Sequence, residues 1–177
     1  MNNSLILVLM AGILANNYAI QNFLGVDSIL SSGSSVKKSL RLGGFVTLIM
    51  VISAVIAWPL QTYVLKHAEY LQTLAFVTVI LIVAAAVEKI AGKSSDRDFL
   101  LFAVNGAVLG LCIRNAQTGF AEAIFAAAGA GLGFLAAMAV FSSLRDRVEE
   151  EEVPEAFRGL PVSLLIVSMM SLALFAF

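Results

Sequence analysis

Long apolar runs separated by short charged connections constrain this chain more than any other feature of its sequence. Each run approaches or exceeds the roughly 20 residues that an α-helix needs to cross about 30 Å of hydrocarbon. Hydrophobic residues make up 60% of the chain and charged residues only 13%, with a mean hydropathy of +0.94, which excludes an ordinary soluble domain. We therefore expect an all-α integral membrane protein with six transmembrane helices. The expected spans are residues 4–24, 42–65, 70–87, 99–113, 118–141 and 160–177.

The positions of lysine and arginine indicate how these spans are oriented, because short loops rich in these residues stay on the cytoplasmic side. Most basic residues follow the first, third and fifth spans, whereas Lys66 and Arg114 follow the second and fourth. Both termini are therefore expected on the outer side of the membrane. The N-terminal segment "MNNSLILVLM" lacks the basic start of a signal peptide, so we expect the first span to be retained. The basic residues that set the orientation are Lys37, Lys38, Arg41, Lys89, Lys93, Arg97, Arg145, Arg147 and Arg158.

The first and fourth spans differ from the others because polar or small residues interrupt them. Asn105, Gly106 and Gly110 fall inside the fourth span, and the amide-rich stretch "NNYAIQN" falls in the second half of the first. Interrupted helices in matching positions of two halves are typical of an inverted repeat with a functional site near the membrane midplane. We expect one membrane domain, residues 1–177, built as a 3+3 inverted repeat with halves of about 1–92 and 93–177. Helices one and four are expected to break near the midplane.

Small residues mark one helix as a close-packing element. The segment "AAAGAGLGFLAAMA", residues 126–139, places Gly129 and Gly133 four residues apart, with Ala126 and Ala137 extending the row. Such rows let a neighbouring backbone approach closely in a membrane. This helix is therefore expected to lie centrally or at an interface.

Polar side chains inside hydrocarbon are costly unless they find partners, so they are the candidates for a functional site. For the amides, the alternative is hydrogen bonding between helices or to backbone groups freed where a helix breaks. Asp27 can instead be a solvated loop residue, and Glu122 can be a rim residue paired with Arg114 rather than an ion ligand. The candidates are Asn16, Asn17, Gln21, Asn22, Asp27, Asn105 and Glu122.

The sequence offers little for soluble-type catalysis. One cysteine, Cys112, and one histidine, His67, exclude a self-contained Cys/His metal site, a disulfide framework or an iron-sulfur motif within this chain. Cys112 has apolar neighbours and is expected to be a small buried hydrophobe. No Walker loop, dinucleotide fingerprint, zinc helix or nucleophile elbow is present. We therefore expect no catalytic residue, no metal ligand and no nucleic-acid partner.

Several segments taken together resemble one known family. The segments "NNYAIQNFLG", "LQTLAF", "NGAVLG", "FSSLRDRV" and "VPEAFRGLPVSLLIVSMMSLALFAF" are similar, in this order, to the A subunit of the Rnf electron transport complex. The E subunit of the sodium-translocating NADH:quinone oxidoreductase is similarly close, and the resemblance covers essentially the whole chain. It implies a bacterial inner-membrane protein with the 3+3 arrangement and broken helices. It also implies further complex subunits as partners, among them a six-helix sister of opposite topology, which is the E subunit in Rnf and the D subunit in the quinone oxidoreductase.

The same resemblance implies a cofactor that this chain is poorly equipped to hold. In the family, each of two sister subunits gives one cysteine from each broken helix to a shared 2Fe-2S cluster, which relays electrons in step with sodium or proton movement. At the two ligand positions this chain has Asp27 and Gly106. Cys112 lies about 9 Å further along a helix than Gly106 and cannot replace it. Because iron-sulfur clusters select thiolates, we expect no cluster bound by this chain.

The leading hypothesis is an integral subunit of an Rnf-like ion-translocating electron transport complex that does not bind the cluster. Such a chain is at most a non-catalytic part of a translocating oxidoreductase. The candidate midplane site is Asn16, Asn17, Asp27 and Asn105, with Gly106 beside it. The alternative is a small inverted-repeat transporter or channel whose half-helix ends and Asp27 bind an ion or a small solute. A purely structural membrane scaffold is a third hypothesis.

Overall fold

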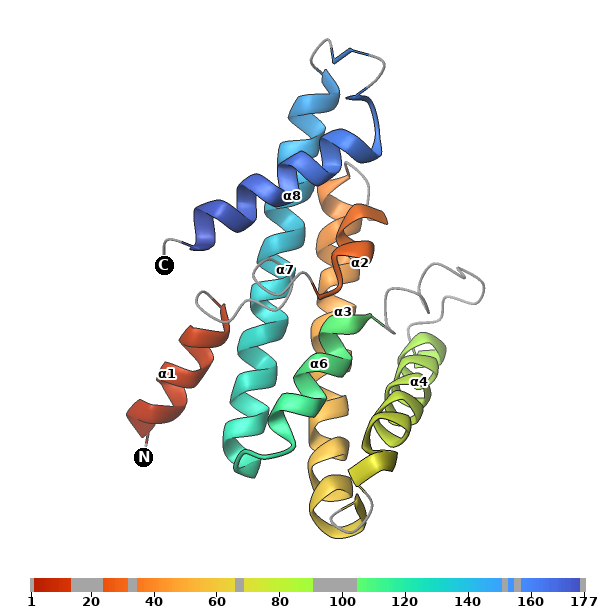
Figure 1. Cartoon of the computed structure of the whole chain (residues 1–177), viewed down its shortest axis with the longest axis vertical. Helices are drawn as coiled ribbons and strands as arrows, with labels where there is room; N and C mark the ends of the chain where they lie inside the picture. Colours follow the sequence, from red (N-terminus) through yellow and green to blue (C-terminus); the bar gives the residue numbers. More distant parts are fainter. Residues whose placement is uncertain are drawn as a thin grey trace.

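The chain folds into helices throughout the part that the computed structural model describes (Figure 1). This part comprises residues 2–13, 24–31, 35–65, 69–90, 105–150, 153–154 and 157–175. No strand occurs in these ranges, so the expected all-α class is confirmed for them. The elements are α1 (Asn2–Ile13), α2 (Val26–Ser31), α3 (Val36–Pro59), η1 (Leu60–Val64), η3 (Glu69–Leu71), α4 (Gln72–Ile90), α6 (Gly106–Asn115), α7 (Phe120–Glu150) and α8 (Leu160–Phe175).

Three helices among the described residues are long and apolar enough to cross a membrane. They are Val36–Val64, which joins α3 to η1, then Gln72–Ile90 and Phe120–Val148. The 29 residues of Val36–Val64 extend about 44 Å at 1.5 Å per residue, which exceeds the roughly 30 Å of hydrocarbon. A fourth helix, Leu160–Ala173, is apolar but shorter. The structure therefore bears out an integral membrane protein.

The helices α3 and α7 extend beyond the spans expected from sequence. α3 begins at Val36 rather than at residue 42, and α7 continues to Glu150 rather than ending at 141. Charged residues mark where hydrocarbon ends, but lysine and arginine are good helix formers and their long side chains reach into water from a continuing helix. The expected boundaries were therefore wrong as helix boundaries.

α3 and α7 run antiparallel as the central pair of the molecule, and Figure 1 shows them side by side along its long axis. A Cβ placed on Gly131 would lie 2.6 Å from Thr47 Cγ2, and one placed on Gly43 would lie 3.2 Å from Leu135 Cα. Thr47 Oγ1 donates its hydrogen bond at this contact and lies 2.8 Å from the carbonyl oxygens of both Gly43 and Gly131. Glycine thus allows the two backbones to approach closely, although through Gly131 rather than through the predicted row of Gly129 and Gly133.

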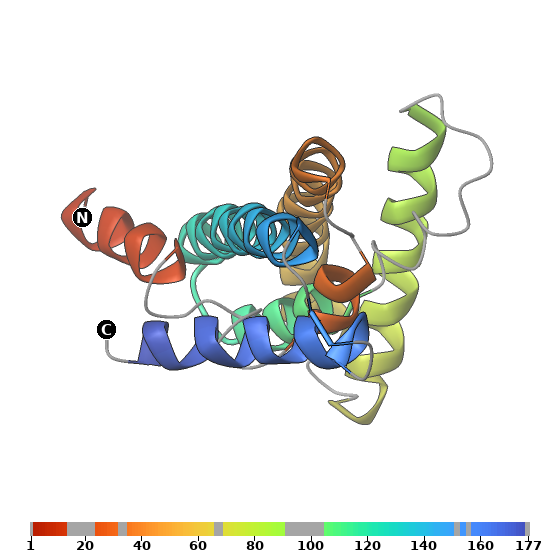
Figure 2. The same cartoon turned by 90° about the horizontal axis from the view of Figure 1, so that it is seen from above.

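A second face of α7 packs against α1. A Cβ on Gly129 would lie 2.5 Å from the carbonyl oxygen of Leu9, and one on Gly12 would lie 3.0 Å from Ala130 N. The predicted central position of this helix is confirmed, because α7 has α3 and α1 as close neighbours. Figure 2 shows α7 lying between them when the molecule is seen from above.

The end of α3 is joined to the turn between α6 and α7. Pro59 cannot donate a backbone hydrogen bond, and the helix continues from Leu60 as the π-helical η1. Trp58 Nε1 donates a 2.8 Å hydrogen bond to the carbonyl oxygen of Thr118, and its ring packs edge-on against Phe120 at 5.1 Å. This contact holds the C-terminal end of α3 against the turn that leads into α7.

Candidate functional site

The start of α2 and the start of α6 meet beside α7. Gly25, which precedes α2, has φ of +81°, a conformation that glycine adopts without strain. A Cβ on Gly25 would lie 3.3 Å from Asn105 Cγ, 3.3 Å from Ala107 Cβ and 3.1 Å from Phe134 Cε2. The chain therefore passes against the first turn of α6 at a point where no larger residue fits. We call the segment Leu24–Asp27 together with Asn105–Ala107 the α2/α6 junction.

Asn105 forms the N-cap of α6. Its backbone is extended, with φ −93° and ψ 158°, and its Oδ1 accepts a 3.0 Å hydrogen bond from Val108 N. Side-chain caps of this kind satisfy one of the backbone N–H groups left over at a helix start. The residue is only 2% exposed, and its Nδ2 has no hydrogen-bond partner among the described residues. Asn105 thus has a structural role through one atom and a buried donor without an acceptor at the other.

Asp27 and Gly106, at which the resemblance places cluster ligands, occupy the first turns of α2 and α6. Both residues are exposed. A Cβ on Gly106 would meet only Leu24 Cδ2 at 3.6 Å and Gly25 N at 3.9 Å, which are ordinary contact distances. A side chain at position 106 therefore meets the described residues only at ordinary contact distances.

Of the predicted midplane site, Asn105 and Asp27 lie within the described residues. Asn105 contacts the segment that leads into Asp27, whereas Asn16, Asn17, Gln21 and Asn22 lie outside the described residues. Glu122 is exposed and lines a pocket of about 160 Å³ together with Arg114 and Asn115. The predicted neighbourhood of Glu122 and Arg114 is therefore present at the rim, away from the α2/α6 junction.

The donor groups at the α2/α6 junction do not fit an iron-sulfur cluster. Clusters are held by thiolates, and the described residues of the junction offer a carboxylate, an amide and glycine. Cys112 is 1% exposed and packs into the apolar core, as expected from its neighbours. No group of three histidine, cysteine, aspartate or glutamate side chains comes together within the described ranges.

Arg145 makes a long-range hydrogen bond that the sequence did not predict. Its Nη1 donates a 3.0 Å hydrogen bond to the carbonyl oxygen of Leu30, near the C-terminal end of α2. A cation at this end of a helix is stabilising. The sequence shows Arg145 only as one of several basic residues after the fifth span, and nothing in its spacing indicates a partner 115 residues away. The contact fastens the long helix α7 to the short helix that carries Asp27.

Comparison with known proteins identifies the family. Residues 5–177 match the model described as "Rnf-Nqr subunit, membrane protein". The A subunit of the ion-translocating oxidoreductase complex of Syntrophotalea carbinolica is 38% identical over 185 residues, which cover 98% of this chain and 96% of the relative. The A subunit of the Na(+)-translocating ferredoxin:NAD(+) oxidoreductase complex of Acetobacterium woodii is 34% identical, with the same coverage. The A subunit of the ion-translocating oxidoreductase complex of Vibrio vulnificus is 30% identical over 183 residues, covering 97% of this chain and 95% of the relative. The chain therefore belongs to the Rnf-Nqr family of membrane subunits.

Proposed function

We propose that this chain is an A-type membrane subunit of an ion-translocating electron transport complex and that it does not ligate the intramembrane 2Fe-2S cluster. The first part is supported by the match of residues 5–177 to the family and by relatives named as A subunits over 98% of the chain. The second part is supported by the α2/α6 junction, where Asp27 and Gly106 replace thiolates. The chain keeps the scaffold of the family and lacks its sulfur ligands.

The chemistry of the replacements supports loss of the cluster rather than a change of ligand. Gly106 offers no side-chain atom, and the carboxylate of Asp27 is a hard oxygen ligand suited to cations such as Mg²⁺ or Mn²⁺. Cys112 points into the core from the following turns of α6. Any role of this protein in electron transfer therefore passes through groups held by other chains.

The proposed topology is the 3+3 inverted repeat with α2 and α6 as the second halves of broken helices one and four. α6 starts with a buried N-cap, and the start of α2 lies against it, as expected where two interrupted spans meet. In this arrangement a six-helix sister of opposite topology lies against the exposed Asp27 and Gly106.

The distribution of charge supports a location in the bacterial inner membrane with both termini on the periplasmic side. Lys37, Lys38 and Arg41 lie at the start of α3, and Arg145 and Arg147 lie near the end of the antiparallel α7. These residues therefore share one end of the central pair (Figure 1). That end is the cytoplasmic one by the positive-inside rule.

The test is purification of the intact complex from native membranes, followed by iron analysis and electron paramagnetic resonance. We expect the sister subunit to copurify, and no 2Fe-2S signal to change when Asp27 is replaced by alanine. A stoichiometric cluster whose signal shifts in the Asp27→Ala complex would overturn the second part of the proposal. A chain that purifies alone, without other subunits, would overturn the first.

Restoring the ligands gives a complementary test. The double variant Asp27→Cys/Gly106→Cys places thiols where the family has them, and the space beside Gly106 accepts one. If the sister subunit carries its own two thiolates, the double variant is expected to gain a 2Fe-2S signal. Cys112→Ala is the matched control and is expected to leave the iron content unchanged.

A second candidate function is favoured by one observation, the buried Nδ2 of Asn105 that lacks an acceptor. An unsatisfied donor at the start of α6 is suited to an acceptor atom of a solute bound between the broken helices. This alternative describes a small transporter or channel. It predicts solute-dependent transport in proteoliposomes that contain this chain alone, and absence of such transport leaves the subunit proposal in place.

A further inference from the structure

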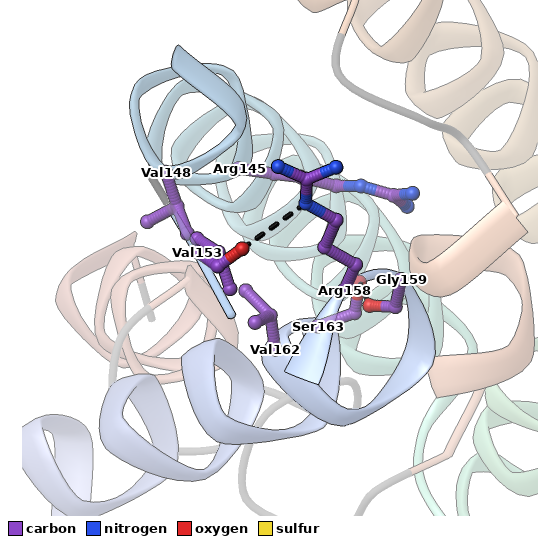
Figure 3. Close-up of a pocket in the computed structure, with 7 residues that line it drawn as sticks. All are labelled: Arg145, Val148, Val153, Arg158, Gly159, Val162 and Ser163. Atoms are coloured by element: carbon purple, nitrogen blue, oxygen red, sulfur yellow. Dashed lines mark hydrogen bonds between the residues drawn. The ribbon is translucent and has the colours of Figure 1, made fainter. Parts of the chain in front are cut away.

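A pocket of about 390 Å³ opens where the end of α7 meets the start of α8. Two arginine side chains, a serine hydroxyl and three valines line it, so the lining is basic on one part and apolar on the other. In Figure 3 the valines lie to one side of the view and the arginines to the other. The lining residues are Arg145, Val148, Val153, Arg158, Gly159, Val162 and Ser163.

The side chain of Arg158 is oriented for binding an anion. Its Nε donates a 3.1 Å hydrogen bond to the carbonyl oxygen of Val153 (Figure 3). That bond orients the guanidinium group, and among the described residues the two Nη groups have no hydrogen-bond acceptor. Guanidinium groups bind phosphate through paired hydrogen bonds, more specifically than an ammonium group does. Arg145 adds a second positive charge to the same lining.

The first turn of α8 supplies further donors. The helix begins at Leu160, and the backbone N–H groups of Leu160 and Val162 have no acceptor inside the helix, whereas Pro161 has no N–H group. Gly159, with φ of +86°, has nothing within 4 Å of a Cβ position, so the approach to this turn is open. The turn carries a partial positive charge that adds to the two arginines.

Apolar surface continues from the pocket into the region of the bilayer. Phe157, Leu160 and Leu164 are each more than half exposed, with 52%, 66% and 51% of their surface accessible. A soluble anion makes no contact with such apolar surface, whereas a phospholipid carries acyl chains next to its phosphate that can pack against it. The pocket lies at the end of the molecule that carries most of the basic residues, and basic pockets at the cytoplasmic side of membrane helices bind anionic headgroups.

From these observations we propose that the pocket binds the phosphate group of an anionic phospholipid, with Arg158 as its main ligand. The valines and the exposed side chains of α8 accept the upper part of the acyl chains. The proposal concerns lipid binding and is independent of whether a cluster is present. It names a site outside the α2/α6 junction.

The experiment is native mass spectrometry of the purified complex in nanodiscs that contain either phosphatidylglycerol or phosphatidylcholine. We expect phosphatidylglycerol, and not phosphatidylcholine, to stay bound to the released complex. Arg158→Gln is expected to weaken this retention about tenfold, because a charge-assisted hydrogen bond to the phosphate is lost. Arg147→Gln, which removes an exposed charge outside the pocket, is expected to leave retention unchanged.

A second variant keeps the test valid if Arg158→Gln impairs folding. Val162→Asp places a carboxylate in the pocket at the first turn of α8, where an acidic residue stabilises a helix start, and it leaves both arginines intact. We expect it to abolish selective retention of phosphatidylglycerol. Equal retention in wild type and both pocket variants would overturn the proposal. Displacement of the bound species by millimolar inorganic phosphate would also overturn the proposal, because it would show that the pocket binds a soluble phosphate rather than a phospholipid.

Discussion

The contact between α3 and α7 differs from the α2/α6 junction in how far its polar groups find partners among the described residues. At the first, glycine brings two backbones together and the hydroxyl of Thr47 finds acceptors on both helices. At the second, a buried amide donor has no acceptor, and Asp27 and Gly106 are exposed. The first region is satisfied within the described residues, whereas under the proposed function a sister subunit lies against the second. The proposed loss of cluster ligands at Asp27 and Gly106 therefore falls outside the contact that holds the central helices together.

The largest effect is expected from closing the space between the central helices. Gly131→Ala places a Cβ 2.6 Å from Thr47 Cγ2 and 3.0 Å from its Cα, so the helices must separate. We expect a loss of roughly 3 kcal/mol or failure to accumulate, at the upper end of overpacking effects. Thermal unfolding monitored by size-exclusion chromatography measures it. Gly44→Ala, which has no described atom within 4 Å of its Cβ, is the matched control and should unfold at or slightly above the wild-type temperature, because alanine favours a helix interior.

A smaller effect is expected from the two glycines of the α2/α6 junction, and it should differ between them. Gly25→Ala forces a side chain into φ of +81° and against Phe134 Cε2, with an expected cost of about 2 kcal/mol. Gly106→Ala meets only ordinary contacts and is expected to change stability by less than about 0.5 kcal/mol. Equal melting temperatures for the two variants would contradict the described geometry of the junction.

Two substitutions of Asn105 distinguish its capping of α6 from a role in ligand binding. Asn105→Ala removes the acceptor for Val108 N and is expected to cost about 1 kcal/mol. Asn105→Ser keeps a capping oxygen and removes the unpaired Nδ2, so its melting temperature should equal or exceed that of wild type. If Asn105→Ser folds normally but abolishes solute transport by the isolated chain, the transporter alternative gains support over the subunit proposal.

An effect similar in size to that of Asn105→Ala is expected at the link between the two regions. Arg145→Met keeps an extended apolar side chain and removes the hydrogen bond to the Leu30 carbonyl oxygen. We expect a loss of about 0.5–1.5 kcal/mol and faster hydrogen exchange in α2. Arg147→Met, at an exposed site two residues further along α7, should leave exchange in α2 unchanged. Unaltered exchange in both variants would show that α2 is held without Arg145.

The sequence predicted the packing region better than the junction, for physical reasons. Small residues spaced four apart on α7 favour close helix packing in a membrane, so its central position followed from the sequence alone. Asn105 is the N-cap of α6, whereas the expected break in the fourth span involves residues before Asn105 that lie outside the described ranges, so the break stays a prediction. The contact of Gly25 with α6 and the bond from Arg145 to Leu30 join residues far apart in the chain. No local pattern encodes such contacts, and the charged residues did not mark the ends of α3 and α7.

The exposure of Gly106 has a consequence for related complexes. If the proposed sister subunit packs against position 106, its facing residue fills the volume that the glycine leaves, because packed interfaces keep no hollows of side-chain size. The residue that faces position 106 in the partner should therefore be larger here than in complexes whose A-type chain carries a side chain at that position. Side-chain size at position 106 and at its facing residue should covary inversely across related pairs of subunits. Paired sequences from many genomes would then locate the interface without a structure of the complex.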